Sequence, residues 1–312
     1  MNRYSDSPSF LSREDLKKQI PRIMAVHDIS CLGRCALTVI IPVLSAMGLQ
    51  AVPLPTALLS THTGGFSDMF FEDLTCHMGQ IGKHLKSIDT DFDAIYSGFL
   101  GSAEQIDVLT SLIRDFSHKN DGSKTFVAVD PVMGDDGELY STYDKSLMLG
   151  MSRLCYGADL ITPNLTEACF LVGEKYPQLI MSRDEGRDMG KELSKKLVDK
   201  FGCEKVVVTG IECSGEEKGE KVVITAARTR GEASDYFHST RLMPRSYPGT
   251  GDVFASVLLG ELLKGKDFYR SVDMASDFVS FVTEFSQRYA TPIRDGLVIE
   301  PCLGRLLDGE KR

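Results

Sequence analysis

The sequence lacks the signatures by which several large enzyme classes are identified. It contains no GxGxxG, HExxH or GxSxG motif, and its eight cysteines include no CxxC pair. Residues 260–266 have the spacing of a Walker A loop, but Asp267 stands where Ser or Thr is required, and the stretch ends a predicted helix instead of following a strand. These absences leave few classes of enzyme, and any site has to be argued from strand ends and helix starts.

The sequence also lacks an excess of positive charge and a long hydrophobic run. Its formal net charge is −9, which disfavours binding to a nucleic-acid backbone or to an anionic membrane surface. No apolar run approaches the ~20 residues of a membrane span, and the N-terminus does not resemble a signal peptide. We therefore expect a cytoplasmic protein with reduced cysteines and a small-molecule partner.

The remaining composition, 42% hydrophobic and 25% charged residues over 312 positions, is typical of a globular protein. We expect a polar N-terminal appendage at 1–20 and a single domain at 21–312. Strands are predicted near residues 22–28, 51–54, 94–97, 125–130, 159–162, 205–209, 221–226 and 233–237. Helices are predicted near residues 36–47, 70–85, 103–117, 144–156, 166–172, 183–201, 252–263 and 268–285.

This alternation of strands and helices predicts an α/β fold. Its central sheet should be mainly parallel, with helices on both faces, because crossover connections place each helix over the sheet. The two strands at 221–226 and 233–237 break the rhythm and predict a small antiparallel hairpin at the edge. Prolines at 53 and 55 place the second strand at an edge, or bend it away from the sheet.

Polar residues follow several of the predicted strands, and in open parallel sheets ligands bind at that edge. His27-Asp28, Ser97-Gly98 and Thr209-Gly210 end predicted strands, and the helix that starts at Asp252 should begin at the same edge. Asp130 ends another strand, and Asn164 with Glu167 follows the next. Carboxylate and amide oxygens of this kind suit Mg²⁺ beside a phosphate chain. Each residue alone would more simply cap a turn, but their arrival at one edge favours a ligand site.

The stretch Gly249-Thr250-Gly251-Asp252 precedes an apolar helical run. The first N–H groups of a helix are unpaired and carry partial positive charge, and glycine allows a phosphate to approach them. An acid there would repel a bound phosphate, so Asp252 suggests a general base that takes a proton from an attacking hydroxyl. The alternative is an ordinary acid in the first turn of a helix, with glycines that only shape a turn.

Five motifs in order make the chain resemble the ribokinase-like superfamily and, within it, the pyridoxal (vitamin B6) kinases. The resemblance covers residues 22–286 and depends on Ser97-Gly98-Phe99-Leu100-Gly101-Ser102, Asp130-Pro131-Val132-Met133-Gly134-Asp135, Thr162-Pro163-Asn164 with Glu167, Val207-Val208-Thr209-Gly210 and Gly249-Thr250-Gly251-Asp252. It implies transfer of the γ-phosphate of ATP to the 5′-hydroxyl of pyridoxal, pyridoxamine or pyridoxine. It also implies a homodimer.

The resemblance also implies roles for individual residues. Asp252 would be the base, and Gly249, Thr250 and Gly251 would form the anion hole. The positions implied around ATP and its Mg²⁺ are Asp130, Asp135, Tyr140, Thr162, Asn164, Glu167 and Thr209, of which Asp130, Asp135 and Glu167 would serve the metal. Thr56 and His62 correspond to substrate-side positions, and the need for a monovalent cation is open.

Two departures bear on the substrate. Asp28 stands where many pyridoxal kinases have a serine, and Phe99 stands where a tyrosine is usual. An acid at position 28 could pair with the aminomethyl group of pyridoxamine through a charge-assisted contact. The related hydroxymethylpyrimidine kinases commonly have a cysteine where Asp252 stands, which favours a B6 vitamer. A hydroxymethylpyrimidine kinase and a B6- or nucleotide-binding sensor without turnover are the alternatives.

Overall fold

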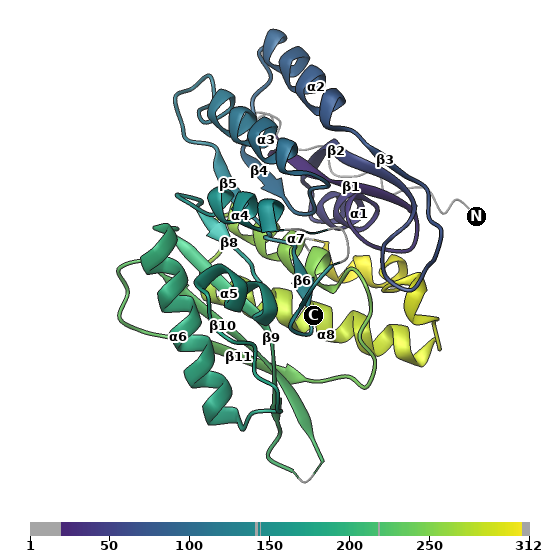
Figure 1. Ribbon diagram of the computed structural model, residues 1–312, viewed down its shortest axis with the longest axis vertical. Coiled ribbons are helices and arrows are strands. Elements are labelled where there is room, and N and C mark those ends of the chain that lie inside the picture. The colour runs from purple at the N-terminus through teal and green to yellow at the C-terminus, as the bar shows by residue number, and fades with distance from the viewer. Residues whose placement is uncertain (1–19, 141–142, 144, 218, 308–312) are drawn as a thin grey trace, which may run out of the picture.

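One large sheet organises the described part of the chain. The computed structural model describes residues 20–307 except 141, 142, 144 and 218, so the predicted appendage lies almost wholly outside the described residues (Figure 1). The strands of the sheet are β1 (Arg22–Leu32), β2 (Gln50–Thr61), β3 (Phe71–Asp73), β4 (Ala94–Ser97), β5 (Phe126–Val129), β8 (Leu160–Ile161), β9 (Lys205–Ser214), β10 (Lys221–Thr229) and β11 (Tyr236–Arg241). A small separate hairpin pairs β6 (Gly134–Asp135) with β7 (Glu138–Leu139).

The strand order is β11-β10-β9-β8-β5-β4-β1-β2-β3. The six strands from β9 to β2 in this order pair in parallel. β10 and β11 form an antiparallel hairpin at one edge, and β3 pairs antiparallel with β2 at the other. The predicted α/β fold, with a mainly parallel sheet and an antiparallel edge hairpin, is confirmed.

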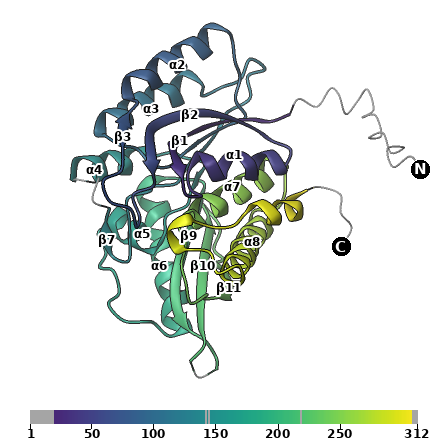
Figure 2. The same ribbon diagram turned by 90° about the vertical axis from the view of Figure 1, so that its right-hand side faces the viewer.

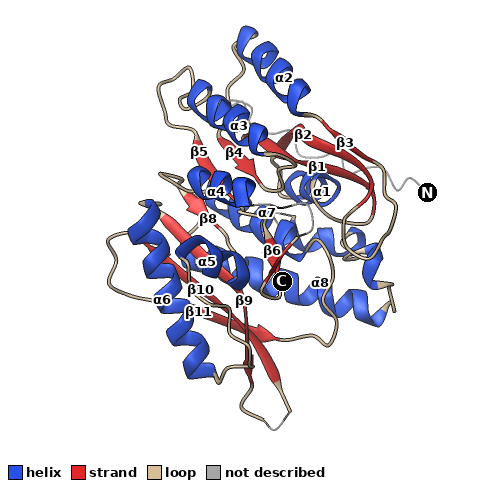
Figure 3. Cartoon of the chain, viewed as in Figure 1, coloured by secondary structure: helices blue, strands red, loops and turns tan. Residues whose placement is uncertain are grey.

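Helices cover both faces of the sheet (Figures 2 and 3). They are α1 (Leu37–Ala46), α2 (Thr75–Ser87), α3 (Ala103–Asp115), α4 (Lys145–Leu154), α5 (Leu165–Val172), α6 (Arg183–Phe201), α7 (Thr250–Leu263) and α8 (Phe268–Arg288). α1, α7 and α8 pack in one hydrophobic core, and α2 to α6 pack in the other. β1 shows why two cores form, since Ile23 and Ala25 face one and Met24 and Val26 the other.

Several element boundaries differ from the predicted ones. β1 continues past residue 28 to Leu32, with a register shift between His27 and Ile29. β2 runs over 12 residues despite its prolines. Its outer side pairs with β3 only at residues 57–59, so no neighbouring strand needs the N–H groups that proline lacks at 53 and 55.

A helix was expected from residue 70, but residues 71–73 form β3 before α2 begins at Thr75. All three residues of β3 are exposed, so they carry no alternating hydrophobic signal. β9 also extends to Ser214, beyond the predicted end, because it pairs with β10 along this length. Within the described residues, the helices are too short or too polar to cross a bilayer.

Two glycines within helices provide a matched test of how α6 docks on the sheet. A Cβ added at Gly186 in α6 would lie 2.1 Å from the Cys213 Sγ of β9, whereas one added at Gly79 in α2 would meet nothing within 4 Å. We expect Gly186→Ala to destabilise the fold by about 1–3 kcal/mol through overpacking. Gly79→Ala should instead stabilise it by up to ~1 kcal/mol through helix propensity. Urea denaturation measures both, and a stabilising Gly186→Ala would contradict this packing.

Candidate active site

The predicted helix start is the N-terminus of α7. Gly249 is its N-terminal cap, with φ of 90°, and the helix begins at Thr250. A Cβ at position 249 would lie 2.2 Å from the backbone oxygen of Arg34, in the loop between β1 and α1. Both the positive φ and this close approach require glycine. The start of α7 is therefore held close to the β1–α1 loop.

Asp252 lies in the first turn of α7, with its side chain 16% exposed. The backbone N–H of Ala36 donates to Asp252 Oδ2 at 2.8 Å. Asp252 Oδ1 lies 4.0 Å from His27 Nδ1, too far for a hydrogen bond. Burial raises the pKa of Asp252, and the Ala36 contact opposes that rise. One carboxylate oxygen is thus fixed and the other remains available.

Ala36 makes this contact from an unusual backbone conformation. Its φ is 50° and its ψ is −137°, a region that non-glycine residues rarely adopt. Backbone strain of this kind costs about 1–3 kcal/mol and persists only when the surroundings impose it. Here the conformation directs the N–H of Ala36 toward Asp252, so the strained residue and the acid belong to one arrangement.

His27 fills the space beneath Asp252 and is only 1% exposed. A Cβ at Gly98, on the loop after β4, would lie 2.3 Å from the imidazole, so that position has to be glycine for the ring to fit. The ring makes an edge contact with Tyr96, with centroids 4.3 Å apart. Burial lowers the pKa of His27 to about 3, so the ring is neutral at physiological pH. Within the described residues, neither ring nitrogen has a hydrogen-bond partner.

Asp28, the next residue, is a second buried acid at this edge. It is 6% exposed, and Ser30 Oγ donates to its Oδ2 at 2.9 Å. Burial raises the pKa of Asp28 to about 7; the charge of Asp252 adds to the rise, and the Ser30 contact opposes it. The two carboxyl groups are therefore close enough to interact electrostatically.

Asp130 provides the third acid from the end of β5. Its N–H donates to the carbonyl of Ser97 at 2.8 Å, which continues the pairing of β4 and β5. A Cβ at Gly251 would lie 3.8 Å from Asp130 Oδ2, so this carboxyl faces the start of α7. Burial and the charge of Asp252 raise the pKa of Asp130 to about 8, against an opposing contact from Thr162. Thus Asp28, Asp130 and Asp252 lie together, as the strand-end argument predicts for Asp130 and Asp252.

Glu167 and Asn164 form the capping box of α5. Glu167 Oε1 accepts the N–H of Met133 at 3.0 Å, and its Oε2 accepts the N–H of Asn164 at 2.9 Å. Asn164 Oδ1 in turn accepts the N–H of Glu167, and its Nδ2 donates to the carbonyl of Gly134 at 2.8 Å. The capping alternative therefore describes what both side chains do here. Burial, together with Asp130, raises the pKa of Glu167 well above its usual range.

The three acids proposed for the metal differ in their exposure and in how many of their oxygens are free. Asp135 is exposed on β6, and both oxygens of Glu167 already accept backbone N–H groups. In the described part of the chain, no three or more His, Cys, Asp or Glu side chains are arranged to hold a metal ion. The shared metal site of Asp130, Asp135 and Glu167 therefore stays a prediction, and of the three it is Asp130 that faces the start of α7.

The substrate-side residues surround this edge, and their polar groups are already engaged. Thr56 Oγ1 donates to the carbonyl of Phe99 at 3.0 Å. His62 Nδ1 accepts the N–H of Gly64 at 3.0 Å, so its Nε2 carries the proton and donates to the carbonyl of Arg294 at 2.7 Å. Phe99 makes an edge contact with the Tyr143 ring. Thr56 and His62 therefore shape the surrounding loops through their side chains.

The remaining nucleotide-side positions lie at the ends of β8 and β9. Thr209 donates its N–H to the carbonyl of Pro163 at 3.0 Å, and its strand bridges to Asn164. Thr162 is buried, and Tyr140 is half-buried beside the β6–β7 hairpin, its N–H bonded to the Met133 carbonyl at 2.9 Å. These positions border Asp130 on the side opposite Asp28.

Sequence reasoning missed three parts of the site. Ala36 and the His27–Gly98 fit depend on contacts between distant segments. The third is the segment after α8, where the backbone carbonyl of Asp295 accepts the N–H of Arg34 at 3.2 Å and Glu300 pairs with the Arg34 side chain. The one available signal was that Gly98 directly follows a predicted strand and that His27 lies near the end of another.

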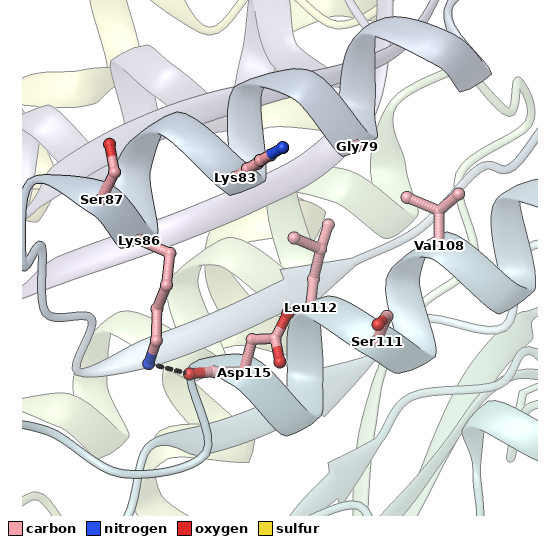
Figure 4. Close-up of a pocket in the computed structure, with 8 residues that line it drawn as sticks. All are labelled: Gly79, Lys83, Lys86, Ser87, Val108, Ser111, Leu112 and Asp115. Atoms are coloured by element: carbon pink, nitrogen blue, oxygen red, sulfur yellow. Dashed lines mark hydrogen bonds between the residues drawn. The ribbon is translucent and has the colours of Figure 1, made fainter.

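A separate surface pocket lies between α2 and α3 (Figure 4). Lys86 spans it by donating to the carbonyl of Asp115. Its lining residues are Gly79, Lys83, Lys86, Ser87, Val108, Ser111, Leu112 and Asp115. None of the predicted site residues lines this pocket, so we do not assign it to the chemistry at α7.

The fold and the relatives of the chain are those of a ribokinase-like phosphotransferase that acts on an alcohol group. The chain belongs to the phosphomethylpyrimidine kinase family, whose model matches residues 41–291. Pyridoxal kinases of the same superfamily are among its relatives. The protein is therefore a kinase of a B6 vitamer or of hydroxymethylpyrimidine, and the resemblance seen in the sequence is confirmed.

Three relatives illustrate this range. A Bacteroides thetaiotaomicron protein assigned as a phosphomethylpyrimidine kinase, crystallised with pyridoxal, is 37% identical with a TM-score of 0.82, covering 92% of this chain and 96% of that one. Pyridoxal kinase PdxY of Pasteurella multocida is 28% identical, covering 78% and 81%. The chloroplastic thiamine biosynthetic bifunctional enzyme TH1 of Arabidopsis thaliana is 25% identical over 92% of this chain, which spans only 51% of that enzyme.

The two glycines of the α7 start should respond differently to alanine. Gly249→Ala forces the loop away from the Arg34 carbonyl, so we expect lower stability and a loss of turnover of about 10²–10³, as for a lost oxyanion donor. Gly251→Ala meets nothing closer than 3.8 Å, so its free energy of unfolding should change by less than ~0.5 kcal/mol. Chemical denaturation and initial rates measure both. Equal destabilisation by the two variants would contradict the described contact.

Proposed function

We propose that the protein transfers the γ-phosphoryl group of ATP to the 5′-hydroxyl of a vitamin B6 vitamer, with Asp252 as general base. One observation carries the proposal: the N–H of Ala36 fixes Asp252 Oδ2, which leaves Oδ1 available on a residue in the first turn of α7. A proton acceptor and an anion site thus lie next to each other, as phosphoryl transfer to an alcohol requires.

In this mechanism the hydroxyl gives its proton to Asp252 Oδ1 while its oxygen attacks the γ-phosphorus. The bond between the γ-phosphorus and the oxygen that bridges it to the β-phosphate breaks, and ADP leaves. The N–H groups of Gly249, Thr250 and Gly251 stabilise the negative charge on the transferring phosphoryl oxygens, assisted by the positive end of the helix dipole. Burial raises the pKa of Asp252, which makes it a stronger base than an exposed carboxylate. The buried ring of His27 excludes water from one side of Asp252. Because the ring is neutral, it leaves the charge of Asp252 unpaired.

The residues fit Mg²⁺ as the companion of ATP. Asp130 is a buried acid that faces the α7 start, and Mg²⁺ is commonly held by one or two carboxylates together with substrate phosphates. Such an ion supplies positive charge to the phosphate oxygens. Asp130 would hold it directly, and Glu167 would act from behind by fixing the backbone at Met133. A contact between Mg²⁺ and Asp135, which is exposed on β6, stays a prediction.

The nucleotide-side proposal extends to the ends of β8 and β9. Thr209 would contact ATP. Thr162 and Asn164 would form the base of the nucleotide site, and Tyr140 would lie over the phosphates. Membership of a kinase family supports the proposal that this chain uses ATP. The requirement for a monovalent cation, the homodimer and the cytoplasmic location stay predictions.

Two observations favour a B6 vitamer over hydroxymethylpyrimidine. The base is Asp252, whereas the pyrimidine kinases commonly have a cysteine there, and the 37% identical Bacteroides protein was crystallised with pyridoxal. On the substrate side, Thr56 fixes the Phe99 backbone, and His62 fixes the loop that follows β2. The family name and the Arabidopsis relative make phosphorylation of hydroxymethylpyrimidine the second candidate.

A coupled assay of ADP release tests the proposal. Pyridoxal, pyridoxine, pyridoxamine and hydroxymethylpyrimidine are each supplied with ATP and Mg²⁺. We expect turnover with at least one B6 vitamer at a kcat/KM above that for hydroxymethylpyrimidine. Preference for the pyrimidine would select the second candidate. Binding of a vitamer without ADP release would select the non-catalytic sensor.

Replacing the base gives a sharper test of the mechanism. Asn at position 252 can still accept the Ala36 N–H through its amide oxygen, so Asp252→Asn should fold and bind ATP nearly normally. Its turnover should fall by about two to four decades, as expected when a general base is lost. Initial rates and ATP titration measure the two quantities. A variant that keeps more than a tenth of the wild-type kcat would remove Asp252 from this role.

A further inference from the structure

We infer that Gly296 is a positioning residue for phosphoryl transfer, which holds the β1–α1 loop where the N–H of Ala36 reaches Asp252. Gly296 belongs to the C-terminal segment, residues 289–307, which follows α8. It lies outside the five motifs that carry the family resemblance. The inference rests on the proposed function, because Asp252 is the base there, and it adds a residue that does not touch the reacting atoms.

Gly296 contacts the backbone of Arg34, two residues before Ala36. The two positions form a parallel bridge, and the N–H of Arg34 donates to the carbonyl of Asp295 at 3.2 Å. A Cβ added at Gly296 would lie 2.7 Å from the backbone oxygen of Arg34, 2.8 Å from its nitrogen and 2.9 Å from its Cβ. Position 296 therefore has no room for a side chain while Arg34 keeps its place.

The backbone conformation of Gly296 also requires glycine. Its φ is 75° and its ψ is −174°, a region that is essentially restricted to glycine. The residue directly follows the 3-10 turn Ile293–Asp295, and its N–H donates to the carbonyl of Ile293 at 3.1 Å. An alanine at this position would meet both backbone strain and a clash with Arg34.

Arg34 is held by two glycines that approach different parts of it. A Cβ at Gly249 would lie 2.2 Å from the Arg34 oxygen and 3.5 Å from the Cα of Cys35, whereas one at Gly296 would meet the nitrogen and Cβ of Arg34. The strained backbone of Ala36 persists only if its surroundings impose it. Together the start of α7 and the C-terminal segment supply that constraint, because they fix the chain just before Ala36.

The C-terminal segment is itself anchored, so it can serve as a support. Leu297 and Ile299 are buried in the core that α1 and α7 share. The N–H of Val298 donates to Ser286 Oγ of α8 at 2.9 Å, and the 3-10 helix Glu300–Leu306 contacts α1 (Figure 2). A segment fixed to the core in this way determines the position of the loop that it contacts.

The Arg34 side chain makes a second connection to the same segment. Its Nη1 donates to the carbonyl of Asp295 at 3.2 Å, and its Nε pairs with Glu300 Oε1 at 2.7 Å. The Arg34 and Glu300 side chains are 32% and 59% exposed, so this pair contributes only about 0–1 kcal/mol. The close backbone contact at Gly296 therefore provides most of the constraint.

Steady-state kinetics of Gly296→Ala with ATP and a B6 vitamer tests the inference. Displacing Arg34 would withdraw the Ala36 N–H from Asp252. We expect kcat to fall roughly tenfold to a hundredfold, since misplacing a catalytic group by ~1 Å can cost about 10² in rate. The KM for ATP should change less than about threefold, because the nucleotide-side residues lie on other elements. Gly304→Ala is the matched control, since its Cβ would meet nothing within 4 Å, and both values should stay unchanged.

Hydrogen exchange of the Ala36 amide separates positioning from a general loss of stability. It is followed by NMR in protein labelled with ¹⁵N-alanine, and Ala255, buried in α7, is the internal reference. Gly296→Ala should accelerate exchange at Ala36 at least tenfold more than at Ala255, and Gly304→Ala should accelerate neither. Positioning requires both this local increase and the fall in kcat, so the absence of either overturns the inference while the proposed function stands.

The proposed function can fail separately. If the wild type phosphorylates no B6 vitamer, that function fails, and the exchange comparison alone decides whether Gly296 holds the Ala36 N–H on Asp252.

If Gly296→Ala does not fold by circular dichroism, Arg34→Met replaces it, because it removes both side-chain connections to the C-terminal segment. Its kcat should fall roughly threefold to tenfold, the value of one hydrogen bond, and an unchanged kcat would overturn the inference. Arg305→Met is the matched control, since this arginine packs on the ring of Phe281 in α8, and its kcat should equal that of the wild type.

Discussion

The hydrogen bond from Ala36 to Asp252 is the constraint around which this site is built. It joins the β1–α1 loop to the first turn of α7, two segments more than 200 residues apart in the chain. The join is possible because position 249 has no side chain to clash with the Arg34 carbonyl. The same contact selects the acid oxygen that can accept a proton. This hydrogen bond thus links the position of the β1–α1 loop, the start of α7 and the ability of Asp252 to accept a proton.

Collecting acids at this edge has an electrostatic cost that the fold does not remove. Asp28, Asp130 and Asp252 come from three different elements, and burial raises the pKa of each. In a structural site such charges would be paired with Lys or Arg. Among the residues that the structure describes, no Lys or Arg pairs with these acids, which weakens the protein but prepares the site for positive charge brought by its ligands. The same unfavourable electrostatics that lower stability therefore favour binding.

Local signals in the sequence predicted the parts of the fold that local forces determine. Helix α6 was predicted at its observed bounds, because Ser182 caps its start and Gly202 ends it with φ of 64°. The strand-end argument placed Asp130 and Asp252 at one edge. The extension of β1, the strand β3 and the Ala36 contact were not predictable in this way. Each depends on pairing with a distant segment, and the residues involved are exposed or have ordinary side chains.

The acids of the site also show why residue type alone did not settle their roles. Asp135 and Glu167 have the same oxygen donors as Asp130, yet one is exposed and the other uses both oxygens on backbone N–H groups. What an acid can do depends on how many of its oxygens the backbone already occupies. Asp252 has one oxygen held and one available, which combines a fixed orientation with reactivity. The N–H of Ala36 holds one oxygen of Asp252 and leaves the other available. A side-chain motif in the sequence does not predict this backbone contact.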